Sequence, residues 1–428
     1  MSLSGLLISH QQKHRSSGAV DATLIVSMSM ASCAPIDAFK TIQKRKSAIH
    51  ARILDETQAH YEALLSTLIN DIVSDSSTAK GEETMISYDE FMVYNSKIFD
   101  NNEKMATLCP HMYLMLPKSK DGTISLKTYK RVILRHLQLN YLSIELMRYS
   151  KINCTHHITE SELESFMYHF MREIATYFKL EENFYMFYVY YCVRKFVFFV
   201  DPNRSLQLSI DKLVHSVVMD ELLCLYEYVK CDTPEEKAEH EFVLLHNYFS
   251  PQNSMQVYED FLELDEDKNG TLSKGEFLKY SSDLVDNMHL TTIAVDRIFS
   301  ENMMCKGLDE MDYKMFLDFV IAYRYRQTKE AIKYFMRVIN NVDIDRTGEV
   351  TMKTINYFYS DIKKILVANN YEPPSDSNIT SEVLDLISSG NGGLKEVLAC
   401  KQGHVVTTLL LDVNSFWRYD NREALGLQ

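Results

Sequence analysis

Apolar residues recur along much of this chain with the spacing of an α-helix. Between residues 36 and 72 they return every three or four positions, which predicts a helix or a pair of helices. Residues 1–36 are rich in Ser, Ala and Met and lack this period, so we expect them to be poorly ordered. The polar stretch 74–83 predicts a linker. The periodic apolar positions are Phe39, Ile42, Ile49, Ile53, Tyr61, Leu64, Leu65, Leu68 and Ile72.

From about residue 84 the pattern changes to helical segments that alternate with short polar loops. Each loop carries one aliphatic residue at a comparable place: Ile124, Ile158, Leu208, Leu272, Met311 and Val350. The last three lie at a regular interval, which suits a repeated helix–loop–helix unit, although other helical arrays could share such spacing. The pattern predicts a mainly α fold, built as an elongated array of these units.

The aromatic cluster from Phe184 to Phe199 predicts a helix that is buried on several sides. The most apolar segment, Phe187 to Val200, overlaps it; Arg194 and Lys195 interrupt this segment, and it is too short to cross a bilayer. Trp417 is the only tryptophan, and we expect it to anchor either the core or an interface.

Composition narrows the class of protein. The chain has 428 residues and 46% apolar content, enough for two or three domains with substantial cores, while only 13 Gly and 8 Pro favour helices. A formal charge of −14 without an arginine-rich stripe argues against nucleic-acid binding. Eight cysteines without a C-x2-C pair indicate reduced thiols, and no secretory signal is evident. We therefore expect a soluble protein of the cytoplasm or nucleus, with no membrane partner.

These changes of pattern predict three regions. Residues 1–83 form a partly disordered and then helical N-terminal region. Residues 84–240 form a domain of degenerate helix–loop–helix units, and residues 241–428 form the domain with the best loops and a C-terminal helical extension.

The strongest motif runs from Asp265 to Glu276 and reads DEDKNGTLSKGE. It satisfies the EF-hand pattern D-x-[DN]-x-[DN]-G-x5-E at every specified position. Calcium prefers about six to eight oxygen ligands, and such a loop supplies them from alternate residues around a sharp turn at glycine. The expected ligands are side-chain oxygens of Asp265, Asp267 and Asn269, the backbone carbonyl of Thr271, Ser273 directly or through water, and both carboxylate oxygens of Glu276.

The flanks of this loop support a helix–loop–helix unit. Val257, Phe261 and Leu264 before it, and Phe277, Tyr280 and Leu284 after it, lie at helical spacing. The alternative is a surface turn that is rich in Asp and Asn and matches the pattern by chance. The combination of ligands, glycine, aliphatic residue and flanking helices favours a calcium site.

A second loop, residues 343–354, is incomplete. It offers Asp343, Asp345, Thr347 and Glu349 as a weak or vestigial metal site. Its twelfth residue is Thr354, which has no carboxylate, so weak binding and purely structural retention both remain open.

The other loops lack essential ligands. The loop 304–315 has no acidic residue at its first, third, fifth or twelfth position, and we expect it to pair its central residue with a neighbouring loop without binding metal. Pro117 replaces the first ligand of one earlier loop, and Leu206 replaces the glycine of another.

No catalytic motif emerges. His240 and His246 are separated by six positions, which places them on different faces of a helix, and Gly390 to Gly393 lacks the spacing of a phosphate-binding loop and predicts a turn. No Ser, His and Asp set forms a known nucleophile motif. We therefore expect a protein that is not an enzyme and has no catalytic residues.

Three longer segments carry a more specific signal. They are Tyr188 to Pro202, Met311 to Val320 and Val406 to Leu425. Together with the loops 265–276 and 343–354, in this order, they resemble the B-double-prime regulatory subunits of protein phosphatase 2A, closest to the gamma-type branch. The resemblance covers roughly residues 84–425.

The resemblance implies a non-catalytic regulator that joins a HEAT-repeat scaffold subunit and a catalytic subunit, and directs them to phosphoprotein substrates. It also implies a cytoskeletal or centrosomal location at microtubule-organising structures such as the spindle, with calcium as the bound ion. Thr354 departs from the complete pattern of some members, so two working calcium sites do not follow. Two alternatives are a stand-alone calcium sensor or adaptor without a phosphatase partner, and an enzyme that uses calcium structurally.

Overall fold

The computed structural model describes most of the chain in separate stretches. These are residues 85–92, 110–150, 156–230, 244–280, 288–306, 310–339, 348–387 and 392–424, with five residues between 48 and 59. Those five, Ala48, Arg52, Asp55, Glu56 and Ala59, are helical, as the apolar period of that region predicts. The chain divides into two compact units, residues 1–158 and 159–428. The predicted domain boundaries at 83/84 and 240/241 lie outside the described residues.

In the first unit, a short antiparallel strand pair precedes a long helix. The backbone of Ile86 lies opposite Ile124, and Met85 lies opposite Ser125. Ser125 then caps the long helix, because its hydroxyl accepts a hydrogen bond from the backbone N–H of Thr128. The described elements of this unit are β1 (Met85–Ile86), α5 (Pro110–Met115), β2 (Ile124–Ser125), α6 (Leu126–Tyr149) and β3 (His157–Ile158).

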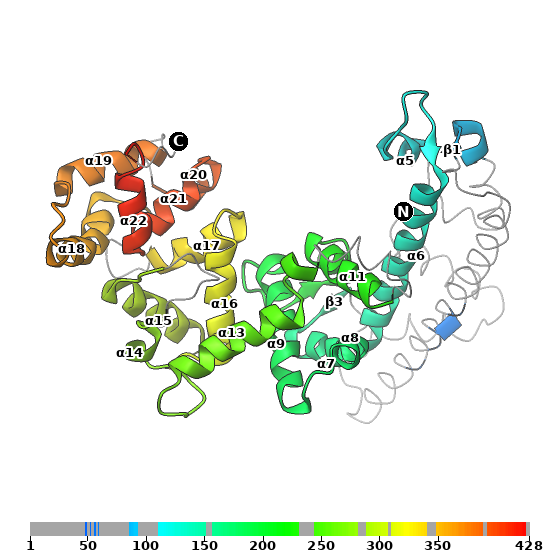
Figure 1. Ribbon diagram of the computed structural model, residues 1–428, viewed down its shortest axis with the longest axis horizontal. Helices are drawn as coiled ribbons and strands as arrows, with labels where there is room; N and C mark the ends of the chain where they lie inside the picture. The colour runs from blue at the N-terminus through cyan, green and yellow to red at the C-terminus, as the bar shows by residue number, and fades with distance from the viewer. Residues whose placement is uncertain are drawn as a thin grey trace, which may run out of the picture. The chain divides into compact units, whose positions relative to one another are not determined.

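The second unit is almost entirely helical where it is described (Figure 1), which confirms the predicted mainly α fold. Its first half contains α7 (Glu160–Phe170), α8 (Arg172–Tyr177), α9 (Glu182–Val200), β4 (Leu208–Ser209), α10 (Ile210–Val214), α11 (Val217–Lys230) and α13 (Pro251–Leu264). Its second half contains α14 (Lys274–Phe277), α15 (Thr292–Lys306), α16 (Tyr313–Arg324), α17 (Lys329–Ile339), α18 (Met352–Ala368), α19 (Asp376–Ile387), α20 (Leu394–Ala399), α21 (Gly403–Leu409) and α22 (Val413–Asp420).

Helix α9 is the centre of the first half of this unit. It packs against α7, α11, α13 and α16, and most of its aromatic residues are buried, which confirms the predicted buried helix. Its Arg194 forms a two-pronged pair with Asp318 of α16, with N–O distances of 2.8 and 2.7 Å, and also binds Glu160 of α7 at 2.8 Å. A buried guanidinium is tolerated here because carboxylates on two helices neutralise it.

The neighbouring Lys195 is also buried, yet it is held differently. Its ammonium group donates to the Glu221 carboxylate and to the Tyr325 hydroxyl, and it lies 4.4 Å from the ring centre of Tyr248. Burial lowers the pKa of Lys195 to about 8, although Glu221 opposes this shift. The two cations that interrupt the apolar segment therefore join α9 to its neighbours.

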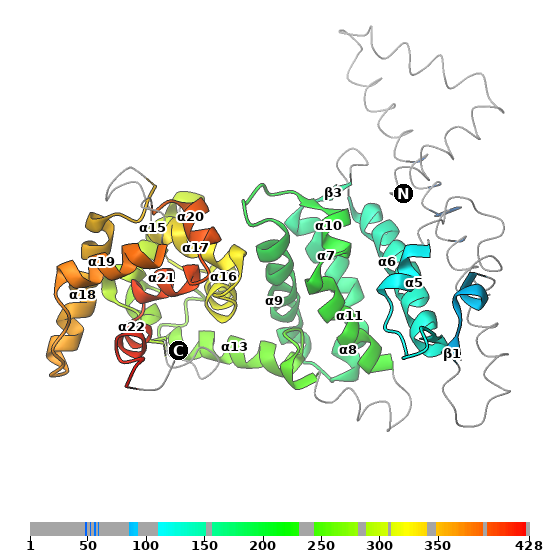
Figure 2. The same ribbon diagram turned by 90° about the horizontal axis from the view of Figure 1, so that it is seen from above.

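The C-terminal helices form a second packed group, in which α17 lies beside α16 and α21 (Figure 2). The buried carboxylate of Asp412 caps α22 by accepting the backbone N–H of Ser415 at 3.2 Å. It also accepts the backbone N–H of His289 at 2.8 Å and the hydroxyl of Tyr323 at 2.6 Å. One carboxylate thus fixes α22, α16 and the segment before α15 together.

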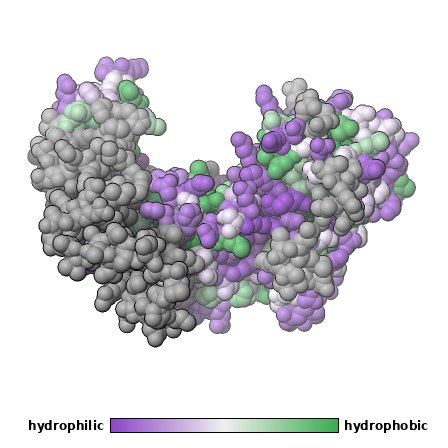
Figure 3. All heavy atoms as spheres, turned by 180° about the vertical axis from the view of Figure 1, so that it is seen from behind, coloured by the Kyte–Doolittle hydropathy of each residue, from purple (hydrophilic) through white to green (hydrophobic). Residues whose placement is uncertain are grey.

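On the face shown in Figure 3, described hydrophobic residues are scattered among mostly hydrophilic ones. No helix in the described stretches is both long enough and apolar enough to span a bilayer. Trp417 is 40% exposed on α22, so the expectation that it anchors the core is wrong. Only its expected role at an interface stays open.

Candidate metal site in loop 265–276

Two packed helices hold the ends of the loop 265–276. Helix α13 begins with Pro251, whose fixed φ suits the first helical turn, and it ends at Leu264, directly before the loop. Near that end the Phe261 ring lies 5.4 Å from Phe316, between ring centres, and after the loop Phe277 lies 5.0 Å from Phe319. Both ends of the loop are therefore anchored on α16 by edge-to-face or tilted aromatic contacts.

The backbone of the loop turns as its glycine predicts. Gly270 has φ +83° and Lys268 has φ +57°, both in the left-handed region. The Asp265 carboxylate stabilises this turn by accepting the backbone N–H groups of Asn269 at 3.1 Å and Gly270 at 2.9 Å. No atom would lie within 4 Å of a Cβ at Gly270, so the requirement for glycine arises from the φ angle alone.

Three carboxylates converge in the loop. Oxygens of Asp265, Asp267 and Glu276 lie within 4.8 Å of one another, and Asp265 and Glu276 are buried. Among the described ion pairs none involves these three. Two nearby lysines pair with other carboxylates, Lys274 with Asp296 and Lys279 with Glu266. Such clustered, uncompensated carboxylates repel one another, and a hard divalent cation relieves that repulsion.

Glu276 is held as an anion by the loop itself. Its Oε1 accepts the backbone N–H of Glu266 at 3.0 Å, and its Oε2 accepts the backbone N–H of Ser273 at 2.8 Å and the Ser273 hydroxyl at 2.7 Å. The hydrogen bonds from Ser273 lower the pKa of Glu276 below its ordinary value. Ser273 in turn caps α14, so the same pair begins the exit helix.

The remaining predicted ligands join the same network. Asn269 donates its side-chain amide to Asp267 at 3.1 Å, and its amide oxygen accepts the backbone N–H of Thr271 at 2.7 Å. Hydrogen bonds therefore link Asp265, Asp267, Asn269 and Thr271 to one another, and Ser273 to Glu276. This donor set of hard oxygens fits calcium.

The loop also pairs with its predicted partner, the loop 304–315. The backbone of Leu272 and that of Met311 exchange two hydrogen bonds, with N–O distances of 2.8 and 2.9 Å. This confirms the expected pairing of central residues. The other predicted central residues Ile124, Ile158 and Leu208 lie in the short strands β2, β3 and β4.

The weaker candidate site, in loop 343–354, lies only partly within the described residues. Asp343, Asp345 and Thr347 lie outside the described residues, and Glu349 is half-buried. The central residue Val350 donates its backbone N–H to the carbonyl of Gly392 at 2.7 Å. A Cβ at Gly392 would lie 2.3 Å from the Val350 carbonyl oxygen, so this close approach requires glycine.

The pairing with Gly392 reveals a loop that the sequence reasoning missed. If Gly392 is the central residue, Asp385, Gly390 and Glu396 hold the first, sixth and twelfth positions of a loop in the sequence, the same spacing as in 265–276. Its N-cap residue has φ −74° and ψ 165°, against −72° and 164° at Ser273. The spacing of Asp, Gly and Glu was the available signal. Its third position is Ile387, which offers no ligand, so it is an EF-hand-like partner loop.

Loop 201–212 adopts the same turn without the same charges. The Asp201 carboxylate accepts the backbone N–H groups of Ser205 and Leu206, both at 2.9 Å. Leu206, which replaces the usual glycine, has φ +64°, and Arg204 has φ +55°. The twelfth residue is Lys212, which cannot serve as a calcium ligand.

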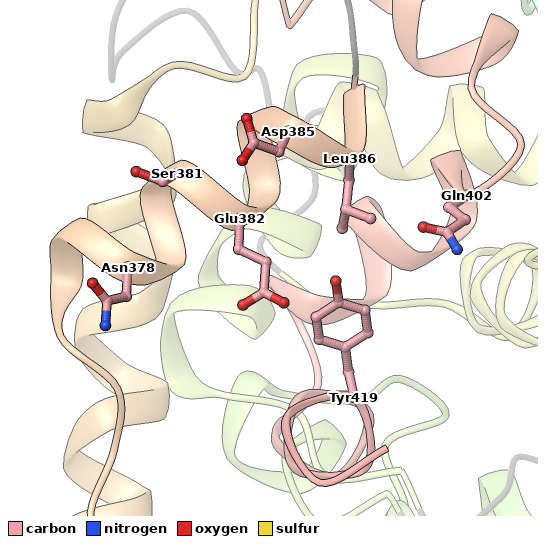
Figure 4. A pocket seen from close by; sticks show the side chains of 7 residues that line it. All are labelled: Asn378, Ser381, Glu382, Asp385, Leu386, Gln402 and Tyr419. Atoms are coloured by element: carbon pink, nitrogen blue, oxygen red, sulfur yellow. The ribbon is translucent and has the colours of Figure 1, made fainter. Parts of the chain in front are cut away.

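A shallow polar pocket lies elsewhere in the second unit (Figure 4), between α19, α22 and the residue before α21. Its Glu382 points toward Tyr419 but is already paired with Arg422 at 2.9 Å. We therefore assign it no ligand. The lining residues are Asn378, Ser381, Glu382, Asp385, Leu386, Gln402 and Tyr419.

Known proteins provide an independent comparison. No family model matches the chain. Its sequence is 31% identical, over 81% of the chain and 72% of the relative, to the gamma-type B'' regulatory subunits of serine/threonine-protein phosphatase 2A from Homo sapiens and from Bos taurus. It is 28% identical, over 74% of the chain and 64% of the relative, to TON2 of Arabidopsis thaliana, a probable B'' regulatory subunit of the same phosphatase.

Among solved structures, the chain resembles one chain of a PP2A PR70 holoenzyme described as its di-calcium form. The TM-score is 0.52 at 20% identity, covering 63% of this chain and 95% of that chain. At this identity the likeness concerns the fold alone.

Proposed function

Because the chain belongs to the B'' family of regulatory subunits of protein phosphatase 2A, we propose that it is a non-catalytic subunit that joins the scaffold and catalytic subunits of that phosphatase. The observation that carries this proposal is the 31% identity to gamma-type B'' subunits over 81% of the chain. The phosphatase metals and catalytic residues would then belong to the partner.

We propose further that the loop 265–276 binds calcium. The convergence of Asp265, Asp267 and Glu276 without a described counter-charge supports this part. The ion would supply positive charge that offsets the repulsion between these carboxylates. The loop residues would then hold α13 and α14 at a fixed angle, and so shape the surface offered to the scaffold subunit.

The location and the substrates rest on the resemblance alone. We propose that the subunit directs the phosphatase to phosphoproteins at the centrosome or another microtubule-organising structure. Fluorescence microscopy of the tagged full chain, together with a centrosomal marker, tests this address. A uniformly cytoplasmic or nuclear distribution throughout the cell cycle would contradict it.

Affinity purification of the full chain followed by mass spectrometry tests the phosphatase partnership. We expect scaffold and catalytic subunits to co-purify with the wild-type chain, and less of both with Glu276→Gln or in the presence of a calcium chelator. Recovery of neither subunit would favour a stand-alone calcium sensor. Equal recovery with and without chelator would retain the partnership and remove the calcium switch.

The purified chain alone provides a second test. We expect no phosphatase turnover on a phosphopeptide substrate unless the catalytic subunit is added. Turnover by the isolated chain, at a rate that follows its concentration through purification, would contradict a purely regulatory role.

A further inference from the structure

Glu310 lies outside the metal loop, yet it contacts that loop directly. The hydroxyl of Thr271 lies 2.5 Å from Oε2 of Glu310. Thr271 and Glu310 occupy the seventh position of their loops, next to the paired residues Leu272 and Met311. The backbone pairing therefore places this side-chain contact beside the site.

The Thr271 hydroxyl has two acceptors and only one proton. Its oxygen lies 2.6 Å from the amide oxygen of Asn269 and 2.5 Å from the carboxylate of Glu310. An ionised carboxylate is the stronger acceptor, so the Thr271 hydroxyl donates its hydrogen bond to Glu310. The amide oxygen of Asn269 then keeps the backbone N–H of Thr271 as its donor, at 2.7 Å, and has a lone pair left for a metal ion.

We propose that Glu310 is a positioning residue for the calcium site, acting through Thr271 from a loop that itself binds no metal. It fixes the residue whose backbone carbonyl is the expected seventh-position ligand, and it keeps Asn269 available. This inference rests on the proposed calcium binding by loop 265–276. It assigns the affinity of the site partly to loop 304–315, which lacks ligands of its own.

Calorimetric titration of the full chain with calcium tests the proposal. Partners that orient metal ligands are worth about 10–100-fold in affinity, so we expect Glu310→Gln to weaken calcium binding about tenfold. Thr271→Val, which removes the hydroxyl but keeps the shape, should have a similar effect. Thr271→Ser, which keeps the hydroxyl, should bind as the wild-type chain does. The double variant should be no weaker than either single variant.

A matched control distinguishes a positioning role of Glu310 from the general effect of removing a negative charge near the loop. Asp296 is a half-exposed carboxylate that pairs with Lys274 of loop 265–276 but contacts none of the expected ligands. We expect Asp296→Asn to change the calcium affinity less than about twofold, since a surface ion pair contributes little. Thermal midpoints without calcium should agree between the variants, because Glu310 and its contact with Thr271 are exposed.

Distinct outcomes overturn distinct claims. If the wild-type chain gives no heat with calcium, the proposed calcium function fails and this inference fails with it. If the wild-type chain binds calcium but Glu310→Gln binds equally well, or weakens no more than Asp296→Asn, only the inference fails. Additive losses in the double variant would also overturn it. Should Glu310→Gln not fold, the difference between Thr271→Val and Thr271→Ser decides.

Discussion

The loops 265–276 and 201–212 turn alike but carry different charges. Each opens with an aspartate whose carboxylate accepts the backbone N–H groups at positions five and six, and each has positive φ at positions four and six. At positions three and twelve, one has Asp267 and Glu276 where the other has Asn203 and Lys212. The shape is therefore shared, whereas the carboxylates are not.

The comparison separates the residues that form the turn of an EF-hand loop from the carboxylates that would bind a metal ion in it. The first aspartate and the left-handed residues suffice for the turn, since loop 201–212 forms it with Leu206 in place of glycine. That loop is held from outside, because Arg204 pairs with Glu301 at 2.9 Å and Arg337 shares the same carboxylate at 3.2 Å. Loop 265–276 is also held from outside, since Lys274 pairs with Asp296 at 2.7 Å, but its own carboxylates are clustered.

The largest expected effect comes from removing the twelfth carboxylate. Glu276→Gln keeps an acceptor for Ser273 but loses the charge, and losing a charged partner costs about 3 kcal/mol, or roughly 100-fold in calcium affinity. Calorimetry on the full chain measures this. Glu162→Gln is the matched control. With Thr159, Glu162 caps α7 in the same way, and it is the twelfth residue of loop 151–162, whose first and third residues, Lys151 and Asn153, are not acidic. If both variants lost calcium affinity equally, the assignment of the calcium site to loop 265–276 would be contradicted.

Creating a calcium site in loop 201–212 tests whether the missing carboxylates are what distinguishes the two loops. Adding carboxylates to loop 201–212 by Asn203→Asp with Lys212→Glu should create a second calorimetric transition at weak affinity, about 10⁻⁴ to 10⁻³ M. Lys212→Gln removes the positive charge without adding a carboxylate and should show no second transition. If the double variant shows no second transition, charge at these two positions is not what distinguishes the loops.

A smaller effect concerns backbone strain. Leu206 is 77% exposed in a conformation that costs a side-chain-bearing residue about 1–2 kcal/mol, so Leu206→Gly should stabilise the chain by about 1 kcal/mol after the entropy of glycine is deducted. Gly270→Ala should destabilise it by a similar amount. Urea unfolding measures both. Opposite signs are expected, and two losses of similar size would show that Leu206 makes contacts worth more than the strain.

The smallest effect is the response to acid without calcium. Hydrogen bonds from Ser273 hold the folded pKa of Glu276 below its ordinary value of 4.5, so the unfolded chain takes up this proton first as the pH falls. The resulting stability is fully present above pH 4.5 and is lost as the pH falls through the folded pKa. Glu276→Gln should flatten this part of the stability curve, and Lys212→Gln should leave it unchanged.

The sequence was sufficient to predict that the side chains of loop 265–276 converge, because they all lie within twelve consecutive residues. The turn depends on a left-handed residue, which glycine reveals, and the pairing of Leu272 with Met311 follows from the repeat of central aliphatic residues. Local chemistry determines both features. The membership of the B'' family was likewise readable from three segments in a fixed order.

Features that depend on distant residues could not be predicted. The partners of Arg194 and Lys195, Asp318 and Glu221, come from other helices, and no local pattern connects them. The sequence predicts Gly392 only as part of a turn, because its close approach to Val350 joins two segments that lie far apart in the chain. Leu206 shows the converse, since a residue that disfavours the turn accepts it when Asp201 and the surrounding helices hold the ends.

The half-exposed Trp417 makes the chain its own optical probe. With a single indole in 428 residues, its emission reports one place only, the outer face of α22. A partner protein that covers this helix would shift the emission to shorter wavelength, whereas one that docks elsewhere would leave the spectrum unchanged. Assembly could then be followed in real time without attaching a dye.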